Sequence, residues 1–373
     1  MTTDTKTSKP LARTRASAAA GASKRAKPKA AKAKEAISRK RGHVRIEDVA
    51  KVAGVGAMTV SRALNQPHTV SAEKRKLVAD AIRKTGYVPN LVAGSLASSR
   101  SKIIAVINPA MRTSIFSDMT QGMWDVLEKE DYQLLLGSTD YSQRREDKLI
   151  RTFISRRVDG LVLTGASHSK SSRRQLENNN ITVIETFDLP ADPIDMVVGF
   201  SAFEAAAEMA RLAGAWGYKN PGIITAPKTT DNRTQRRIDG FISGLKDVKL
   251  RLKKKSVCEA QALTMKAGGA ALEQLLAADP TIDIVLCTND ILAVGALLAC
   301  QRNGWSSPER VAVTGFGDIE IADQLSPSLT TVRVRGYEMG QRIGELMLAR
   351  LQGDVAQAHI CDMGFEIIRR QSA

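Results

Sequence analysis

The sequence predicts an all-α helix-turn-helix head joined to an α/β core of two doubly wound lobes. Three short helical patterns lie between residues 46 and 86. Two short helices joined by a glycine-containing turn, with a third helix bracing them, form the helix-turn-helix arrangement. From residue 103 onward, short apolar runs alternate with helical stretches, which is typical of βαβ units with parallel sheets. This part is too long for one compact sheet, so we expect two lobes.

The composition of the 373 residues changes along the chain and marks the expected domains. Residues 1–42 have almost no large apolar side chain, so this basic tail cannot bury enough surface to become ordered. The tail is either a solvated segment or an arm with non-specific affinity for nucleic acid. The other expected segments are a head at 43–90, a hinge and linker at 91–101, and a core at 102–373, with a first lobe at about 102–199 and 334–357 and a second lobe at about 200–333 and 358–373.

Within the head, each helical pattern has recognisable ends. The first begins at Ile46 and closes with a turn at Gly54, and the second runs over Ala57–Leu64. The third opens at Ser71, a good N-cap residue, and stops at Gly86, a good C-cap residue. The predicted apolar face of this third helix consists of Leu77, Val78, Ala81 and Ile82.

Strands and helices alternate in the expected core, and ligands of such open sheets bind at the carboxyl ends of the strands. The expected strands are Ile103–Ile107, Gln133–Leu136, Gly160–Leu163, Thr182–Ile184, Gly222–Ile224, Ile284–Leu286 and Val311–Thr314. The expected helices are Asp118–Lys129, Arg145–Ser155, Ala202–Ala213, Gln235–Leu245, Ala267–Ala277 and Asp290–Arg302.

The net charge of +16 is concentrated in the first quarter of the chain. Residues 1–42 hold 13 Lys and Arg against 2 Asp and Glu, and residues 43–102 hold 10 against 4. Residues 103–373 are nearly neutral, with 32 against 33. A positive charge confined to one region is the electrostatic footprint expected for a polyanion. Nucleic acid is therefore the predicted partner of the head, and the core has another role.

The sequence does not indicate catalytic, metal or disulfide chemistry. Cys258, Cys287, Cys300 and Cys361 have no C-x-x-C spacing, so we expect reduced thiols in a cytoplasm. The four histidines lack metal-ligand spacing, and none joins a G-x-S-x-G motif. We therefore expect no enzymatic activity, no cofactor and no metal. No run is long enough to span a bilayer and no secretory signal is present, so we expect no membrane partner.

Four motifs occur in order over Ile46–Ser101: DVAxxAGV, TVSRxLN, VS and GYxPNxxAxxLxxxxS. They closely resemble the DNA-binding head of the LacI/GalR family of bacterial repressors. The two-lobed pattern follows where that family has a periplasmic-binding-protein-like core of type I, so the resemblance covers all but the tail. It implies a cytoplasmic, nucleoid-associated transcriptional repressor whose binding to operator DNA is controlled by a small metabolite.

The resemblance also implies that the second helix of the head lies in the major groove with its N-terminal residues at base edges. Arg62 can bond bidentately to guanine or can clamp phosphate, and Met58 can contact a thymine methyl or pack in the head. Arg45 departs from the Thr or Ser that relatives usually have as a helix cap. The implied DNA-binding residues are Ala57, Met58, Thr59, Ser61, Arg62, Asn65, Tyr87, Asn90 and Leu96.

The segment Leu91–Ser98 matches the hinge helix of the family. It is too short to be stable alone, and Gly94 weakens it by roughly 1 kcal/mol relative to Ala, so we expect it to be disordered in the free protein. In relatives the leucine equivalent to Leu96 inserts into the minor groove and kinks the operator. The alternative is that Leu96 packs on the core.

In the core, the resemblance implies a ligand site at the carboxyl ends of the strands. Arg237 lies in RTQRRIDGF, where the family has its binding-pocket arginine, and Glu185 aligns with an acid that meets ligand hydroxyls. Asp290 can instead cap its helix, and Gly317, next to Asp318, stands where many relatives have a ligand-binding aspartate. The implied effector-binding residues are Phe116, Glu185, Arg237, Asn289, Asp290 and Asp318.

Three cationic side chains, Arg233, Arg236 and Arg237, lie within about one helical turn and favour a ligand with a carboxylate or phosphate. The sequences at 315–316 and 362–365 also look like the gluconate-utilisation repressors of the family. A sugar acid such as gluconate or 6-phosphogluconate is therefore the expected effector, and a neutral sugar or a nucleoside is the alternative. A sugar-binding transport protein is the alternative from a different class.

We expect the chain to form a homodimer or a tetramer. Two heads must bind adjacent half-sites of a pseudo-palindromic operator, which requires a two-fold arrangement of subunits. No heptad-repeat tail follows Arg370, which disfavours the tetramerisation helix of some relatives.

Overall fold

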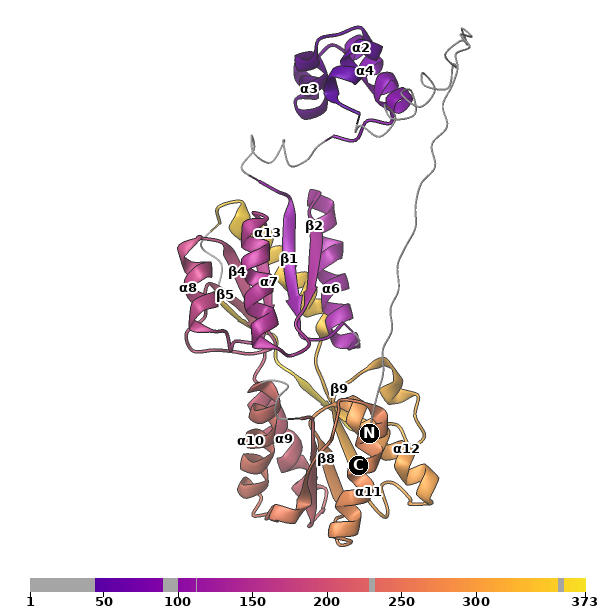
Figure 1. Ribbon diagram of the computed structural model, residues 1–373. Helices are drawn as coiled ribbons and strands as arrows, with labels where there is room; N and C mark the ends of the chain where they lie inside the picture. The colour runs from indigo at the N-terminus through magenta and orange to yellow at the C-terminus, as the bar shows by residue number, and fades with distance from the viewer. Residues whose placement is uncertain (1–43, 90–99, 112, 228–231, 355–358) are drawn as a thin grey trace, which may run out of the picture. The chain divides into compact units, whose positions relative to one another are not determined.

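The computed structural model describes residues 44–89, 100–111, 113–227, 232–354 and 359–373. The chain divides into two units, residues 1–90 and residues 91–373, which are described one after the other (Figure 1). The basic tail, the hinge segment over Leu91–Ser98 and the predicted DNA-binding residues Asn90 and Leu96 lie outside the described residues.

Within residues 44–89, the head is a helix-turn-helix unit built around a small apolar core. Its helices are α2 (Ile46–Ala53), α3 (Ala57–Asn65) and α4 (Ala72–Thr85), and the short 3-10 helix η2 (Pro67–Thr69) lies between α3 and α4. Its core consists of the buried side chains Val49, Ala50, Ala53, Val60, Val78 and Ala81. The predicted all-α head is confirmed.

Local sequence fixes the ends of these helices. At the start of α2, the Asp48 carboxylate accepts a hydrogen bond from the Arg45 backbone N–H at 2.9 Å. Asp48 thus satisfies one N-terminal N–H, although Arg45 provides no capping side chain. At the start of α4, the Ser71 hydroxyl accepts a bond from a backbone N–H, as predicted. Gly86 ends α4 with a φ of 66°, which glycine adopts without a Cβ penalty.

The buried face of α4 is narrower than predicted. Val78 and Ala81 are each 2% exposed, whereas Leu77 is 44% exposed. Neighbouring residues on a helix point about 100° apart, so Leu77 lies at the edge of the stripe that enters the core. The prediction that Leu77 packs on this face was wrong.

The core contains two sheets, one in each lobe, and the predicted doubly wound α/β architecture is confirmed. The first sheet has the order β11 (Ile360–Asp362), β5 (Met196–Gly199), β4 (Thr182–Thr186), β3 (Gly160–Thr164), β1 (Ile103–Asn108), β2 (Gln133–Ser138). The second has the order β12 (Glu366–Ile368), β10 (Thr330–Arg333), β9 (Ala312–Gly317), β8 (Ile284–Cys287), β6 (Pro221–Thr225), β7 (Val257–Glu259).

The two sheets share one topology. In each, the first strand of the lobe lies between its second and third strands, and a strand from the end of the chain completes the edge. The sheets differ in that last strand: β11 runs parallel to β5, whereas β12 runs antiparallel to β10.

The first lobe extends further along the chain than predicted. β11 pairs with β5, with Ile360 opposite Val197 and Asp362 opposite Gly199. The lobe boundary expected at residue 357 was therefore wrong, because residues 360–362 belong to the first sheet. The chain crosses between the lobes three times among the described residues, after β5, after β10 and after β11.

Helices cover both faces of each sheet (Figure 1). On β1, Ile104 packs in a cluster with α6 and α13, and its neighbour Ala105 packs in a cluster with α7 and α8, because successive strand residues face opposite sides. In the second lobe, α9 and α10 cover one face and α11 and α12 the other. The helices are α6 (Ser114–Leu127), α7 (Gln143–Ser155), α8 (Lys170–Asn178), α9 (Ala202–Ala215), α10 (Asn232–Asp247), α11 (Met265–Ala278), α12 (Asp290–Asn303) and α13 (Gly336–Leu351).

Glycine allows one helix pair in each lobe to pack closely. A Cβ on Gly340 of α13 would collide with the backbone carbonyl of Met119 in α6. A Cβ on Gly244 of α10 would collide in the same way with the carbonyl of Ala207 in α9. These contacts hold the helices at backbone-to-backbone distance, so each lobe is a rigid support for the side chains it presents.

Residues 100–102, which lead into β1, are bonded to the first lobe at three places. Arg100 donates to the Leu351 carbonyl at the end of α13 at 2.7 Å. The Asp159 carboxylate accepts bonds from the Ser101 backbone and hydroxyl and from the Lys102 backbone, at 2.7 to 3.0 Å. The Lys102 ammonium lies 4.3 Å from the centre of the Tyr132 ring. We call residues 100–102 with these contacts the linker anchor.

Over the part of the chain that the structure describes, no helix is both long enough and apolar enough to cross a membrane.

Candidate functional site

The head presents side chains of α3 that point away from its core. Met58 is 67% exposed, and Arg62 and Asn65 are also exposed. The alternative in which Met58 packs inside the head is therefore wrong. Met58 and Arg62 lie four residues apart, on one face of the helix, where both can meet the same surface.

The other predicted DNA-binding residues of the described head are less exposed. Thr59 and Ser61 are half-buried, and the Ser61 hydroxyl lies 3.4 Å from the Asn65 amide nitrogen. Ala57 and Tyr87 pack against the apolar core of the head. Ala57 and Tyr87 therefore support the exposed face that carries Met58 and Arg62, and contribute little exposed surface of their own.

The other two helices of the head also carry exposed basic side chains. The exposed cations of α2 and α4 are Lys51, Lys74, Arg75, Lys76, Arg83 and Lys84. Asp80 pairs with Arg83, so one of these cations has an acidic neighbour within the helix. The others give the head the positive surface that attracts a polyanion.

Two adjoining cavities lie between the lobes of the core. The larger has a volume of about 270 Å³, the smaller about 50 Å³, and Tyr141 and Arg233 line both. Both lie where strands of the two sheets end, which is the place expected for a ligand site in this architecture.

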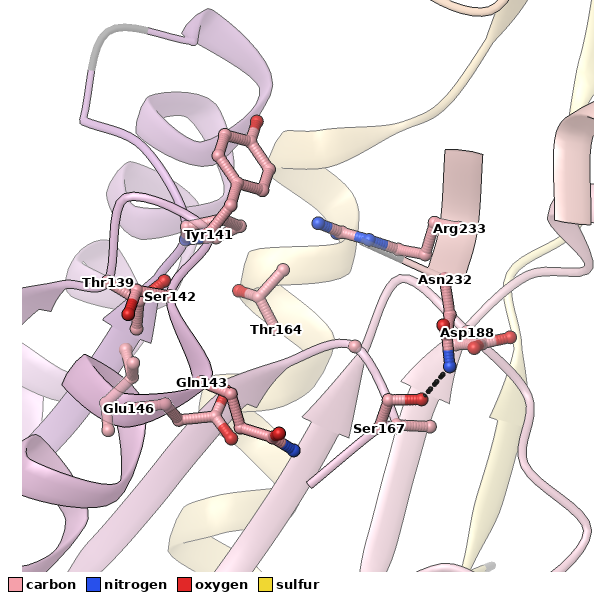
Figure 2. A pocket seen from close by; sticks show the side chains of 14 residues that line it. Thr139, Tyr141, Ser142, Gln143, Glu146, Thr164, Ser167, Asp188, Asn232 and Arg233 are labelled. Carbon is pink, nitrogen blue, oxygen red and sulfur yellow. Dashed lines mark hydrogen bonds between the residues drawn. The ribbon is translucent and has the colours of Figure 1, made fainter. Parts of the chain in front are cut away.

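The first lobe lines the larger cavity with hydroxyl, amide and carboxylate groups (Figure 2). Gln143 and Glu146 come from the first turn of α7, just after β2. Thr164 is the last residue of β3, and Ser167 follows it. The lining side chains of this lobe that carry polar groups are Thr139, Tyr141, Ser142, Gln143, Glu146, Thr164, Ser167 and Asp188.

The second lobe contributes Asn232 and Arg233, from the first turn of α10. The Asn232 amide donates to the Ser167 hydroxyl across the cavity, so the two lobes touch here (Figure 2). The Arg233 guanidinium lies 5.7 Å from the ring centre of Phe116 and 5.9 Å from that of Phe187. These rings hold the cation at the junction of the two cavities.

The smaller cavity brings together three of the predicted effector-binding residues, Phe116, Arg237 and Asn289. Arg237 donates to the Thr288 carbonyl at 2.7 Å and stacks 3.9 Å from the ring centre of Phe316. Asn289 caps α12 by accepting a bond from the Ile291 N–H at 2.8 Å. Arg237 and Arg233 are four residues apart on α10, so both guanidinium groups extend from one face of that helix.

Three other predicted effector-binding residues line neither cavity. Glu185 is buried and accepts a bond from the Ile194 N–H at 2.7 Å. Asp290 accepts bonds from the Ile319 N–H and the Thr331 hydroxyl, at 2.9 and 2.6 Å. Asp318 pairs with Arg333 and Arg370 at the end of the second sheet. Each carboxylate is bonded inside its own lobe, so the role of these three residues as ligand contacts stays a prediction.

His168 connects the cavity wall to the buried Glu185. Its Nδ1 lies 2.8 Å from Glu146 Oε1, and its Nε2 lies 3.1 Å from the Gly165 carbonyl and 3.5 Å from Glu185 Oε1. Burial disfavours the charged imidazole, but the bonds to the two carboxylates outweigh it and raise the pKa of His168 to about 9. The ring is therefore an imidazolium at neutral pH.

Two further acids near the site differ in environment. Burial raises the pKa of Asp290 to about 6, against the hydrogen bonds from Thr331 and Ile319 that favour its charged form. Asp188 lines the larger cavity and pairs with Arg236 at 2.7 Å. Arg236 thus directs its charge toward Asp188 of the first lobe.

Sequence reasoning named Arg233 among the three cationic side chains that favour an anionic ligand, and the structure places it at both cavities. It did not select Glu146 or Gln143. Gln143 and Glu146 follow a predicted strand, so the rule that ligands bind at strand ends could have identified them. No group of His, Cys, Asp and Glu among the described residues is placed to hold a metal ion.

A helix-turn-helix head with an exposed basic face, joined to a two-lobed core with a polar cavity, defines a DNA-binding regulator controlled by a small ligand. Comparison with known proteins agrees. Residues 45–90 match the model of bacterial regulatory proteins of the lacI family, and residues 101–361 match that of periplasmic binding proteins and the sugar binding domain of the LacI family. The chain belongs to the LacI family and is a transcription regulator, not an enzyme.

Individual relatives are similar over almost their full length. The HTH-type transcriptional regulator GntR of Pseudomonas aeruginosa is 34% identical over 335 residues, which is 90% of this chain and 97% of the relative. GntR of Escherichia coli strain K12 is 32% identical over 322 residues, which is 86% of this chain and 96% of the relative. A LacI-family regulator from Silicibacter pomeroyi superposes with a TM-score of 0.83 at 29% identity, covering 88% of this chain and 99% of that one.

Proposed function

We propose that this LacI-family regulator is a dimeric repressor that a sugar acid, such as gluconate or 6-phosphogluconate, releases from its operator. The observation that carries the ligand class is the pair Arg233 and Arg237 on α10, which line cavities whose opposite wall bears hydroxyl and amide groups. Guanidinium groups bind carboxylates through two parallel hydrogen bonds, and hydroxyl and amide groups bind the alcohols of a sugar chain. Family membership alone leaves the ligand open.

The resemblance to gluconate-utilisation repressors supports the same class of ligand, and two similar relatives carry the name GntR. In the proposed mechanism, the ligand binds between the lobes and favours one of their relative orientations. The linker anchor joins the first lobe to the segment that leads to the head, so a change in the lobe can reach the head through the chain.

Calorimetric titration of the full chain tests the ligand class. We expect D-gluconate or 6-phosphogluconate to bind and to release DNA in a gel shift. Arg237→Ala should weaken binding at least tenfold, since a hydrogen bond to a charged group contributes about 1.5–3 kcal/mol. Arg251→Ala, which removes an exposed arginine from the same lobe, is the matched control. Binding of a neutral sugar or a nucleoside, with no response to either acid, would contradict the proposal.

The head is tested separately with Arg62→Ala. We propose that Arg62 bonds to a guanine and that Met58 contacts a neighbouring base, with α3 in the major groove. The substitution should then cost about 1–3 kcal/mol per half-site on operator DNA and much less on random DNA. Equal losses on both DNAs would show that Arg62 only clamps phosphate.

A further inference from the structure

The larger cavity has two chemically different ends. Arg233 enters it from α10 of the second lobe, and Glu146 lies across it on α7 of the first lobe, beside Gln143 (Figure 2). One end therefore offers the Arg233 guanidinium, which is only a hydrogen-bond donor, together with the Asp188 carboxylate that pairs with Arg236. The other end offers the Glu146 carboxylate, which is only an acceptor when ionised.

The Glu146 carboxylate faces the ring of His168, which in turn lies against Glu185. Glu146 Oε1 faces the His168 Nδ1 at 2.8 Å. The other ring nitrogen of His168 faces two acceptors, the Gly165 carbonyl at 3.1 Å and Glu185 Oε1 at 3.5 Å. Because acceptors lie at both nitrogens, both carry protons and the ring is cationic. The imidazolium of His168 thus lies between the side chains of Glu146 and Glu185, and we call these three residues the cluster.

The cluster is shielded from solvent. The side chains of His168 and Glu185 are 3% and 2% exposed, and that of Glu146 is 13% exposed where it meets the cavity. Charges in such surroundings interact more strongly than charges in water, because there is less solvent to screen them. Among the described residues, His168 is the only side chain that bonds to the Glu146 carboxylate, which leaves its Oε2 for the contents of the cavity.

We propose that Glu146 makes this cavity selective for a ligand with a single anionic end. This inference rests on the proposed function and narrows it. The carboxylate of the sugar acid lies toward Arg233, and the hydroxyl groups at its other end donate to Glu146. A ligand with a second anionic group has only acceptors to place against Glu146 and meets like-charge repulsion instead of a hydrogen bond.

The consequence is a choice between the two candidate effectors. Gluconate presents an alcohol at the end remote from its carboxylate, and 6-phosphogluconate presents a phosphate there. Glu146 therefore favours the aldonic acid over its phosphate. A dicarboxylic sugar acid is disfavoured for the same reason, and it meets Glu146 with a carboxylate in either orientation.

Calorimetric titration of the full chain with D-gluconate, D-glucarate and 6-phosphogluconate tests the inference. D-Glucarate carries the second charge with little added bulk, so it separates charge from size. We expect gluconate to bind at least tenfold more tightly than either of these two more highly charged acids. If glucarate or 6-phosphogluconate binds as tightly as gluconate, the inference is overturned and a sugar acid remains the ligand. If no sugar acid binds, the proposed function itself fails.

Glu146→Gln tests the role of the charge. The variant keeps the shape of the side chain and an oxygen for a ligand hydroxyl, so the ratio of gluconate to glucarate affinity should fall to less than threefold. Glu177→Gln, which removes an exposed carboxylate from α8 of the same lobe, should leave the ratio at its original value. An unchanged ratio in Glu146→Gln overturns the inference. The comparison of ligands in the unmodified protein tests it independently if the variant does not fold.

Discussion

The two lobes of the core share a strand order but use their acidic side chains in opposite ways. In the first lobe, Glu146 follows a strand and lines the larger cavity. In the second lobe, Asp290 and Asp318 also follow strands, yet each is bonded within the lobe, to Thr331 and to Arg333 respectively. His168 bonds to only one oxygen of Glu146, whereas both oxygens of Asp290 and of Asp318 are bonded within their lobe. A carboxylate that follows a strand is thus available to a ligand only when its own lobe leaves one oxygen unbonded.

The two lobes also line the two cavities with different kinds of charged group. The second lobe supplies Arg233 and Arg237 from one face of α10. The first lobe supplies hydroxyl and amide groups and the carboxylate of Glu146. A ligand with a charged end and a hydroxylated chain can satisfy both walls at once, so binding of such a ligand links the lobes.

Asp290→Ala should have the largest effect, on stability. The Ile319 N–H and the Thr331 hydroxyl would lose their partner in a buried site, and we expect the free energy of unfolding to fall by about 3–5 kcal/mol. Urea denaturation measures this loss. Asp323→Ala, at an exposed acid of the same lobe, is the control and should change stability by no more than about 0.5 kcal/mol. Similar small losses in both variants would mean that Asp290 is not a structural acid.

The second effect is a pH dependence carried by the first lobe. The pKa of His168 is raised to about 9, above its ordinary value of 6.5, so folding favours the protonated ring. The resulting stability is complete below pH 6.5 and is lost as the pH rises to about 9, amounting to about 3 kcal/mol. Denaturation curves between pH 6 and 10 should show this decrease. His168→Gln should remove it, and a decrease that persists in the variant must come from other groups.

Asp318→Asn should have the smallest effect and separates structure from binding in the second lobe. Asp318 pairs with Arg333 and with the half-buried Arg370, so we expect a loss of stability of about 2 kcal/mol. Because Asp318 lines neither cavity, the affinity for gluconate should change by less than about twofold, or about 0.4 kcal/mol. A tenfold loss of affinity would instead show that Asp318 contacts the ligand.

Most of the fold could be predicted because its elements have strong local signals. β1 and β8 are short apolar runs bounded by turns, and α4 of the head has a clear cap at each end. The edge strand β11 has no such signal, since Ile360 is its one large aliphatic residue and is exposed. Its pairing with β5 depends on a contact about 160 residues away in sequence, which no local pattern contains.

The site was harder to predict because residue type and position do not determine the direction of a side chain. Arg237 was identified from its motif, and it lines the smaller cavity. Glu185 was identified from its alignment with relatives, but its neighbour His168, 17 positions earlier, holds it within the lobe. Only the packing of the loop after β3 brings these two residues together. The acidic side chain that lines the larger cavity is therefore Glu146, whereas the sequence predicted Glu185 for this role.

The linker anchor has a consequence for building chimeric regulators. Arg100, Ser101 and Lys102 belong structurally to the first lobe, because their bonds go to Leu351, Asp159 and the loop before β2. A head taken from another protein should therefore be spliced before residue 100. A junction placed after Lys102 would replace all three residues of the linker anchor. The foreign residues would then have to bond to Asp159 and to the Leu351 carbonyl at the end of α13, which come from a different protein.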